Sequence, residues 1–236
     1  MSEWLSRVER MVGNENLQKL CCARIAVLGL GGVGAFAAES LCRSGIGSML
    51  LVDSDCIDIS NLNRQLIALR DTVGEPKIQI AQARFKNINP DIDITGSNEF
   101  LLSENIDFIR EWQPDVVLDA IDTVTAKLAV AKLCSEANIP LISCMGTGNR
   151  LHPELLRVGR ISDTAGCGCS LARVMRRELT KREIPSPIVV YSTELPLEPV
   201  TNTTLNGRHP PASMAFVPCA AGSTMAATAV RLLLGL

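Results

Sequence analysis

The chain has 236 residues, 47% of them hydrophobic, and a formal net charge of −2 at pH 7. This length and apolar content suffice for one large domain with a core. The mild acidity argues against a protein that coats nucleic acid with its whole surface, but it is compatible with one local basic patch. Nine cysteines, without the spacing of a small secreted scaffold, indicate reduced thiols.

The start of the chain lacks the apolar core of a signal peptide, and no segment offers about twenty uninterrupted apolar residues. Residues 219–236 have a helical composition but read as too short and too polar for a membrane span, so we expect them to pack in a core or a dimer interface. We therefore expect a cytoplasmic protein that does not enter a membrane.

Periodicity and turn residues predict alternating strands and helices along most of the chain. The predicted strands cover residues 25–30, 48–52, 92–94, 116–118, 140–144, 155–161 and 188–191, and the predicted helices cover residues 7–20, 35–43, 75–89, 103–112, 125–137, 171–182 and 219–236. The helix over 103–112 is expected to have a serine cap at Ser103. Residues 185–211, which hold six prolines, predict a mobile crossover loop.

This rhythm predicts an α/β fold: a Rossmann-like, doubly wound, mainly parallel sheet with a C-terminal crossover loop and an antiparallel extension. We expect a single domain over residues 1–236. Its nucleotide-binding part is predicted to cover residues 1–148, and a substrate-facing extension to cover residues 149–236.

A glycine-rich turn follows the first strand. Gly29, Gly31 and Gly34 have Gly-X-Gly-X-X-Gly spacing, and a helix follows whose N-terminus would attract an anion. Asp53 ends the second strand, nineteen positions past Gly34, where an acidic residue suits a ribose hydroxyl. The pattern fits a nicotinamide or flavin enzyme, an ATP-using enzyme, or a turn that binds nothing.

Further motifs follow in a fixed order and narrow these alternatives. They are Gly-Leu-Gly-Gly-Val-Gly ending at Gly34, Asp53-Ser-Asp55, Ser60-Asn-Leu-Asn-Arg-Gln65, Lys77 and Asp119-Ala-Ile-Asp122. Together they resemble the ubiquitin-activating-enzyme-like adenylyltransferase superfamily (the ThiF, MoeB and HesA type) over nearly the whole chain. The stretches 146–153, 161–163 and 169–179 resemble its tRNA threonylcarbamoyladenosine dehydratase branch.

The resemblance implies that a carboxylate attacks the α-phosphate of ATP and forms an acyl adenylate, which an internal nucleophile traps. The substrate carboxylate would belong to the threonine moiety of N6-threonylcarbamoyladenosine beside a tRNA anticodon, which closes into a ring with loss of water. The alternative is activation of the C-terminal glycine of a ubiquitin-like sulfur carrier. That branch usually carries paired Cys-X-X-Cys zinc ligands, which are absent from this sequence, so no zinc is expected.

The resemblance also assigns candidate site residues. Those expected to bind ATP are Gly29, Gly31, Gly32, Gly34, Asp53, Asp55, Ser60, Asn61, Arg64, Lys77, Asp119 and Asp122. Magnesium prefers carboxylate oxygens, so Asp119 is expected to hold the metal, its alternative role being a cap for the next helix. Arg64 and Lys77 would offset phosphate charge in the transition state. Arg10 would reach the nucleotide of a neighbouring subunit, which requires a homodimer.

The helix over residues 171–182 has a basic side that is a candidate tRNA contact, carried by Arg173, Arg176 and Arg177. The alternative is an ordinary solvated face. Cys144, Cys169 and Cys219 are candidate thiol nucleophiles, but free cysteine is commonly a small buried hydrophobe. A sulfur-transfer protein is a further expected partner, and an oxidoreductase or a non-catalytic nucleotide-binding scaffold are the remaining alternatives.

Overall fold

The computed structural model describes residues 3–198, 200 and 211–236. Its strands are β1 (Arg24–Leu28), β2 (Ser48–Val52), β3 (Asp93–Ser97), β4 (Val116–Asp119), β5 (Leu141–Cys144), β6 (Leu156–Arg160) and β7 (Ile188–Ser192). Its α-helices are α1 (Ser6–Val12), α2 (Asn14–Cys22), α3 (Gly34–Arg43), α4 (Lys77–Ile88), α5 (Asp107–Glu111), α6 (Val124–Glu136), α7 (Ser170–Lys181) and α8 (Phe216–Leu234).

The strands form one sheet in the order β3-β2-β1-β4-β5-β7-β6, in which only β6 is antiparallel to its neighbour. The sheet is therefore mainly parallel and doubly wound, as predicted. Chain order reverses between β1 and β4, and in such sheets ligands bind at the carboxyl ends of the strands beside this reversal. The predicted antiparallel extension is the β6 edge.

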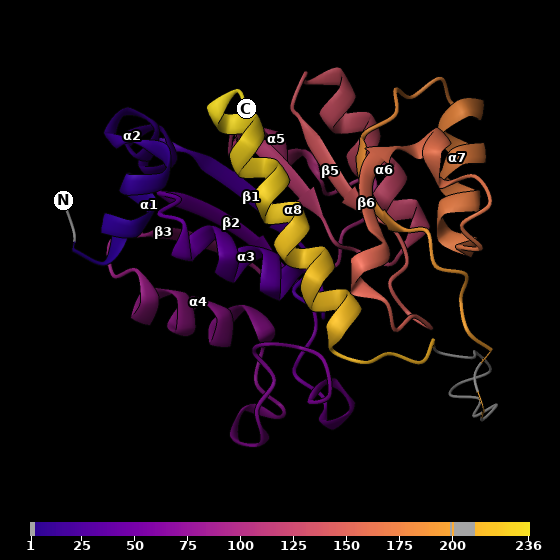
Figure 1. Cartoon of the computed structure of the whole chain (residues 1–236), viewed down its shortest axis with the longest axis horizontal. Helices are drawn as coiled ribbons and strands as arrows, with labels where there is room; N and C mark the ends of the chain where they lie inside the picture. Colours follow the sequence, from indigo (N-terminus) through magenta and orange to yellow (C-terminus); the bar gives the residue numbers. More distant parts are fainter. Residues whose placement is uncertain (1–2, 199, 201–210) are drawn as a thin grey trace.

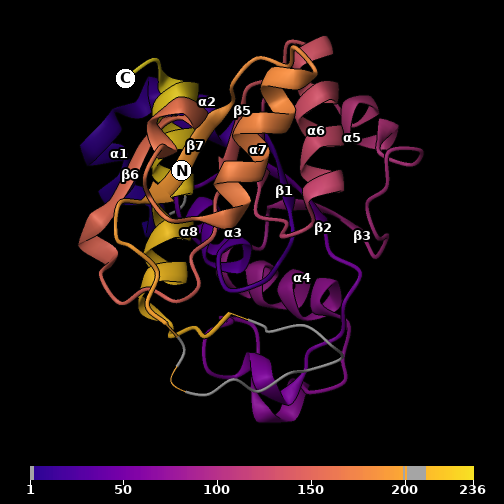
Figure 2. The ribbon, with the colours of Figure 1, turned by 90° about the vertical axis from the view of Figure 1, so that its right-hand side faces the viewer.

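Helices cover both faces of the sheet (Figure 1). Successive side chains of a strand point to opposite faces, so Ile25 and Val27 pack with α3, α4 and α8, while Ala26 and Leu28 pack with α5, α6 and α7. Figure 2 shows α8 on one side of the molecule and α5 and α6 on the other. The apolar runs of the parallel strands follow from this double burial.

Helix α8 packs closely against α3 because its contact face is made of small residues. A Cβ added at Gly222 would lie 2.3 Å from the carbonyl oxygen of Val33, so only glycine allows this approach. Within the described ranges, α8 is the one helix long and apolar enough to cross a membrane by length and composition. The sequence-based prediction that it is too short was therefore wrong, and its packing on α3 and the sheet makes it a core helix.

Two helix predictions were also wrong. The helix expected over residues 7–20 is divided into α1 and α2 at Gly13, whose φ of +82° favours glycine. The helix expected over residues 103–112 shrinks to α5, which has no side-chain cap, because residues 103–105 form a turn instead. Part of the predicted crossover loop, residues 199 and 201–210, lies outside the described residues.

Candidate functional site

A cavity of about 640 Å³ lies at the carboxyl ends of β1, β2, β4 and β5, beside the reversal of strand order. This volume falls in the range of roughly 300–1,000 Å³ typical of small-molecule sites. The predicted nucleotide residues that line it are Gly29, Gly31, Gly32, Asp53, Asp55, Asn61, Arg64, Lys77 and Asp122. The fold thus brings nine separately predicted residues to one place.

The glycine turn between β1 and α3 forms one wall of the cavity. Gly29 has a φ of +87°, and a Cβ there would lie 3.0 Å from the carbonyl oxygen of Ala120. A Cβ at Gly34 would lie 1.7 Å from the carbonyl oxygen of Gly29, so Gly34 allows the helix to start against the turn rather than lining the cavity. Helix α3 consequently begins at the cavity, where its N-terminus favours an anion.

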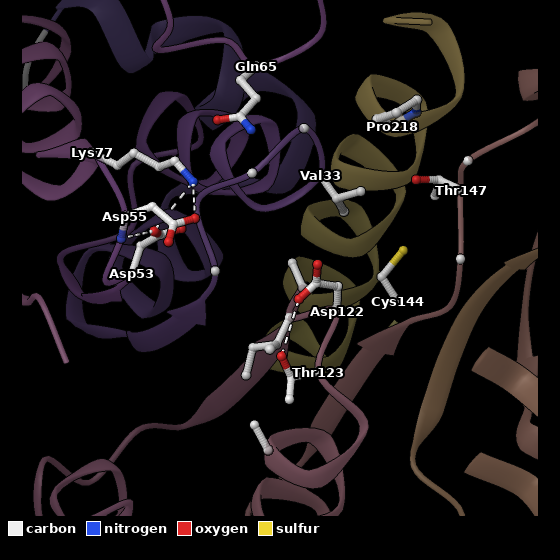
Figure 3. Close-up of a pocket in the computed structure, with 18 of the residues that line it drawn as sticks. Val33, Asp53, Asp55, Gln65, Lys77, Asp122, Thr123, Cys144, Thr147 and Pro218 are labelled. Atoms are coloured by element: carbon white, nitrogen blue, oxygen red, sulfur yellow. Dashed lines mark hydrogen bonds and ion pairs between the residues drawn. The ribbon is translucent and has the colours of Figure 1, made fainter. Parts of the chain in front are cut away.

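Asp53, at the end of β2, is held in a fixed orientation beside this turn. Its Oδ2 accepts a hydrogen bond from the backbone N–H of Leu30 at 2.6 Å, and its Oδ1 accepts one from Asp55 at 2.9 Å. The ammonium of Lys77 lies 3.5 Å from Asp53 Oδ1 and 2.8 Å from Asp55 Oδ2 (Figure 3). The Lys77 side chain is 5% exposed and lines the cavity together with both carboxylates.

The polar loop after β2 folds into a short 3₁₀ helix, Ile59–Asn61, because Asp58 caps it. Asp58 Oδ1 accepts from the N–H of Ser60 at 2.8 Å, and Asn61 Oδ1 accepts from the N–H of Asp58 at 3.1 Å. Arg64 donates from Nη1 to the carbonyl oxygen of Ser60 at 2.9 Å. Ser60 itself does not line the cavity; its carbonyl orients Arg64, which does.

Asp119 does not reach the cavity. It is fully buried, and its Oδ2 accepts from Lys127 Nζ at 2.8 Å and from Ser143 Oγ at 2.6 Å. Its Oδ1 accepts from the N–H of Ile121 at 3.1 Å. Neither oxygen faces the cavity, which disagrees with the expectation that Asp119 holds a metal. The exposed carboxylate of Asp122 lines the cavity instead (Figure 3).

The remaining predicted site residues lie outside the cavity. Arg10 is exposed on α1, away from the cavity wall. On α7, Arg173 and Arg177 are exposed, and Arg177 pairs with Glu178 at 2.9 Å. Arg176 is half-buried and donates to Thr164 Oγ1 at 2.7 Å, so it serves the fold rather than the solvated face of the helix.

Several cavity residues were missed as candidates from the sequence, and Gln65 and Thr147 are two of them. Gln65 lines the cavity and is 8% exposed, and its buried Oε1 has no hydrogen-bond partner among the described residues. Its signal was its place at the end of the polar loop. Thr147, from the turn after β5, also lines the cavity and faces it in Figure 3. Side chains from that turn give the cavity a second wall opposite Lys77.

The three candidate thiols lie in different surroundings. Burial raises the pKa of Cys144, which lines the cavity, to about 12. Burial also raises the pKa of Cys219. Cys169 Sγ accepts from the N–H of Ala172 at 3.4 Å and caps α7. A thiolate is the reactive form, so the burial of Cys144 and Cys219 does not favour nucleophilic catalysis by either residue.

A magnesium ion would have to share its coordination with phosphates. In the described part of the chain, no group of three or more His, Cys, Asp or Glu side chains is arranged to hold a metal. Mg²⁺ is commonly held by one or two carboxylates, water and substrate phosphates. Asp122 fits that pattern, because its exposed carboxylate lies in the same cavity as the glycine turn.

Comparison with known proteins shows the family of this chain. The ThiF family model matches residues 5–236. The tRNA threonylcarbamoyladenosine dehydratase of Bacillus subtilis (strain 168) is 40% identical over 236 residues, covering 95% of this chain and 92% of that protein. The crystal structure of Escherichia coli tRNA N6-threonylcarbamoyladenosine dehydratase, TcdA, in complex with ATP has a TM-score of 0.90 at 29% identity, covering 99% of this chain and 94% of that chain.

A relative of the alternative kind is also similar, over a shorter stretch. The sulfur carrier protein ThiS adenylyltransferase of Escherichia coli (strain K12) is 36% identical over 137 residues, covering 57% of this chain and 54% of that protein. The match to the Bacillus subtilis dehydratase therefore covers a larger share of this chain than the match to this adenylyltransferase, 95% against 57%.

Proposed function

The chain belongs to the ThiF family, and from this premise we propose that it catalyses the ATP-dependent dehydration of N6-threonylcarbamoyladenosine in tRNA. The observation that carries the proposal is the cavity itself, in which a glycine turn at a helix N-terminus, two cations and an exposed carboxylate converge. This set suits a bound nucleoside triphosphate. The fold is that of an ATP-bound dehydratase along the whole chain.

The chemistry balances without an enzyme nucleophile. The threonyl carboxylate attacks the α-phosphate of ATP, a phosphoanhydride bond breaks, and pyrophosphate leaves. The neighbouring carbamoyl group then attacks the activated carbonyl carbon, and AMP leaves with one oxygen of the former carboxylate. The net change in the nucleoside is the loss of one water, which closes a ring.

The charged residues act on the phosphates. Lys77 and Arg64 lie on the cavity wall and would offset the negative charge that shifts during attack on the α-phosphate. The turn at Gly31 and Gly32 allows backbone N–H groups to approach the phosphates closely. Asp53, oriented by Leu30, would accept a hydrogen bond from a ribose hydroxyl.

Magnesium is part of the proposal, with Asp122 as its protein ligand. Bound there with the phosphates, the ion would neutralise part of their charge and orient them for in-line attack. Asp122 is well placed because it follows β4 at the strand-end edge of the sheet, while Asp119 is committed to its buried partners. We therefore assign the metal role to Asp122.

The partners of the protein are also part of the proposal. The substrate is tRNA, and the exposed Arg173 and Arg177 on α7 would contact its phosphates. Arg10, exposed on α1, would complete the site of a second copy of the chain, so a homodimer is proposed. A sulfur-transfer protein as partner and a cytoplasmic location stay predictions.

The decisive experiment incubates the purified protein with ATP, magnesium and tRNA bearing threonylcarbamoyladenosine, followed by nucleoside mass spectrometry. The expected products are a nucleoside lighter by one water, AMP and pyrophosphate. The Asp122→Ala variant should not form the dehydrated nucleoside. Pyrophosphate exchange that appears only with a ubiquitin-like sulfur carrier would replace the proposal with the alternative. Binding of reduced nicotinamide cofactor without ATP binding would indicate an oxidoreductase.

A further inference from the structure

A buried cation lies directly behind the cavity wall. Lys127, on α6, is completely inaccessible to solvent. Its Nζ is 2.8 Å from Asp119 Oδ2, 3.0 Å from Ser143 Oγ and 2.8 Å from the carbonyl oxygen of Cys144. Asp119 and Ser143 are register partners on β4 and β5, so one ammonium joins the ends of two neighbouring strands.

Burying this charge is costly, and removing one partner of such a pair leaves an uncompensated ion. Hydrophobic residues of similar size would fill the space without that cost, as they do along the rest of α6, where Val130, Leu133 and Cys134 are buried. Burial of the pair is therefore weak evidence that it stabilises the fold.

The geometry of the pair concerns the two loops which line the cavity. Asp119 orients the loop after β4, because its Oδ1 accepts from the N–H of Ile121 at 3.1 Å. Lys127 holds the start of the loop after β5 through the carbonyl oxygen of Cys144. The cavity residues that follow directly on these two contacts are Asp122 and Thr123 in one loop and Met145, Gly146, Thr147 and Gly148 in the other.

We propose that Lys127 is a positioning residue whose ammonium, through Asp119, Ser143 and Cys144, fixes the separation of these two loops at the nucleotide site. It does not touch the substrate. The proposal rests on the proposed function, because the loop after β4 carries Asp122, the proposed metal ligand, and the loop after β5 lies across the cavity from it. A shift of about 1 Å between reacting groups can lower a rate about 100-fold, so small changes in this separation matter.

A pair that only stabilised the fold would behave differently. Its removal would lower the midpoint of unfolding but leave the turnover of the folded fraction unchanged. The informative variant is Asp119→Asn combined with Lys127→Met, which removes both charges and leaves no unpaired buried ion. The matched control is Lys132→Met, one turn further along α6, where the lysine is exposed and pairs with Glu136 at 3.7 Å.

Each variant is first tested for folding by circular dichroism and urea unfolding. ATP affinity is then measured by calorimetry, and kcat and KM for cyclisation by nucleoside mass spectrometry. We expect the double variant to lose about 100-fold in kcat with a smaller change in KM, and to bind ATP more weakly, while Lys132→Met matches the unchanged protein. A folded double variant with unchanged kcat and ATP affinity would overturn the proposal.

Ser143→Ala keeps both charges and serves if the double variant does not fold. It removes one contact of Lys127 and one of Asp119, and we expect it to lower kcat and ATP affinity in the same direction by a smaller factor. Unchanged values in this variant would also overturn the proposal. ATP affinity is measured without tRNA, so it tests the role of Lys127 independently of the tRNA reaction. If the unchanged protein failed to cyclise its substrate, the proposed function would be refuted, but the effect of the variants on ATP affinity would still test the role of Lys127.

Discussion

Asp119 and Asp122 lie three positions apart at the end of β4, yet Asp119 is buried in an ion pair with Lys127 and Asp122 is exposed in the cavity. Asp119 continues the alternation of the strand. Val117 faces the α6 side of the sheet, and Asp119, two residues later, faces the same side. Asp122 has left the strand, so its carboxylate is available to a ligand.

This difference predicts opposite phenotypes for the two aspartates. Asp119→Asn leaves the ammonium of Lys127 buried without a counter-charge, so we expect the free energy of unfolding to fall by about 3–5 kcal/mol in urea titrations. Asp122→Asn should unfold like the unchanged protein but require more magnesium and lose most cyclisation activity. Equal stability of the two variants, or full activity of Asp122→Asn at low magnesium, would contradict the assignment.

Lys77→Met tests the cation at the cavity wall. Because its ammonium lies beside the predicted phosphate site, its loss should lower kcat by about 100-fold, measured by steady-state cyclisation of modified tRNA. Lys19→Met is the control, since Lys19 pairs with Glu15 on the surface of α2. A folded Lys77→Met protein with the kcat of the control would show that Lys77 only holds Asp53 and Asp55.

Substitutions of two glycines in the same turn are predicted to have different effects, one on ATP binding and one on stability. At Gly31 an added Cβ meets no atom within 4 Å, so Gly31→Ala should fold normally and weaken ATP binding by entering the cavity. At Gly34 the Cβ would lie 1.7 Å from a backbone oxygen, so Gly34→Ala should be destabilised by about 1–3 kcal/mol or more. Thermal unfolding and calorimetric titration with ATP separate the two effects, and an equally destabilised Gly31→Ala would contradict this prediction.

The contribution of Glu39 to the free energy of unfolding depends on pH. Burial raises the pKa of Glu39, but hydrogen bonds from Arg84 and Arg43 outweigh it and lower the pKa below the ordinary value of 4.5. A lowered pKa in the folded state means that the stabilisation is present above about pH 4.5 and is lost as pH falls through the folded value.

We therefore expect Glu39→Gln to lower the free energy of unfolding by about 1 kcal/mol at pH 7, an amount limited by the partial exposure of the two arginines. The difference from the unchanged protein should shrink below about pH 4.5 in urea titrations. Glu136→Gln, in an exposed pair with Lys132, is the control. A Glu39→Gln effect that grows with acidity would have the wrong sign.

The cysteines are predicted to be dispensable for the reaction. Cys169→Ala should keep ATP binding and cyclisation and cost about 0.5–2 kcal/mol of stability through the lost cap of α7. In iodoacetamide labelling near pH 8, followed by peptide mass spectrometry, the exposed Cys21, Cys22 and Cys56 should react before Cys144, whose pKa of about 12 keeps it protonated. An inactive Cys169→Ala protein that still binds ATP would indicate covalent catalysis.

Local chemistry was enough to predict most of the elements. The apolar run of β2 and the end of α3 at Arg43 were predicted correctly, because a doubly covered strand and a helix end each have a short-range signature. The predicted helix boundaries were wrong where the conformation of neighbouring residues determines where a helix begins or ends. Gly13 divides one amphipathic pattern into two helices, and α5 has no cap at Ser103 because the preceding residues form a turn.

By itself, the sequence predicted that a glycine turn and Asp53 lie at the carboxyl edge of a parallel sheet, because each follows a predicted strand. The resemblance to the ThiF, MoeB and HesA type added Arg64 and Lys77 to this site. Only the tertiary structure decided which aspartate of Asp119-Ala-Ile-Asp122 faces a ligand. That choice depends on α6, which brings Lys127 against the α6 side of β4 and so fixes Asp119 in the interior. The contact between a helix face and a strand end depends on packing, which spacing along the chain does not encode.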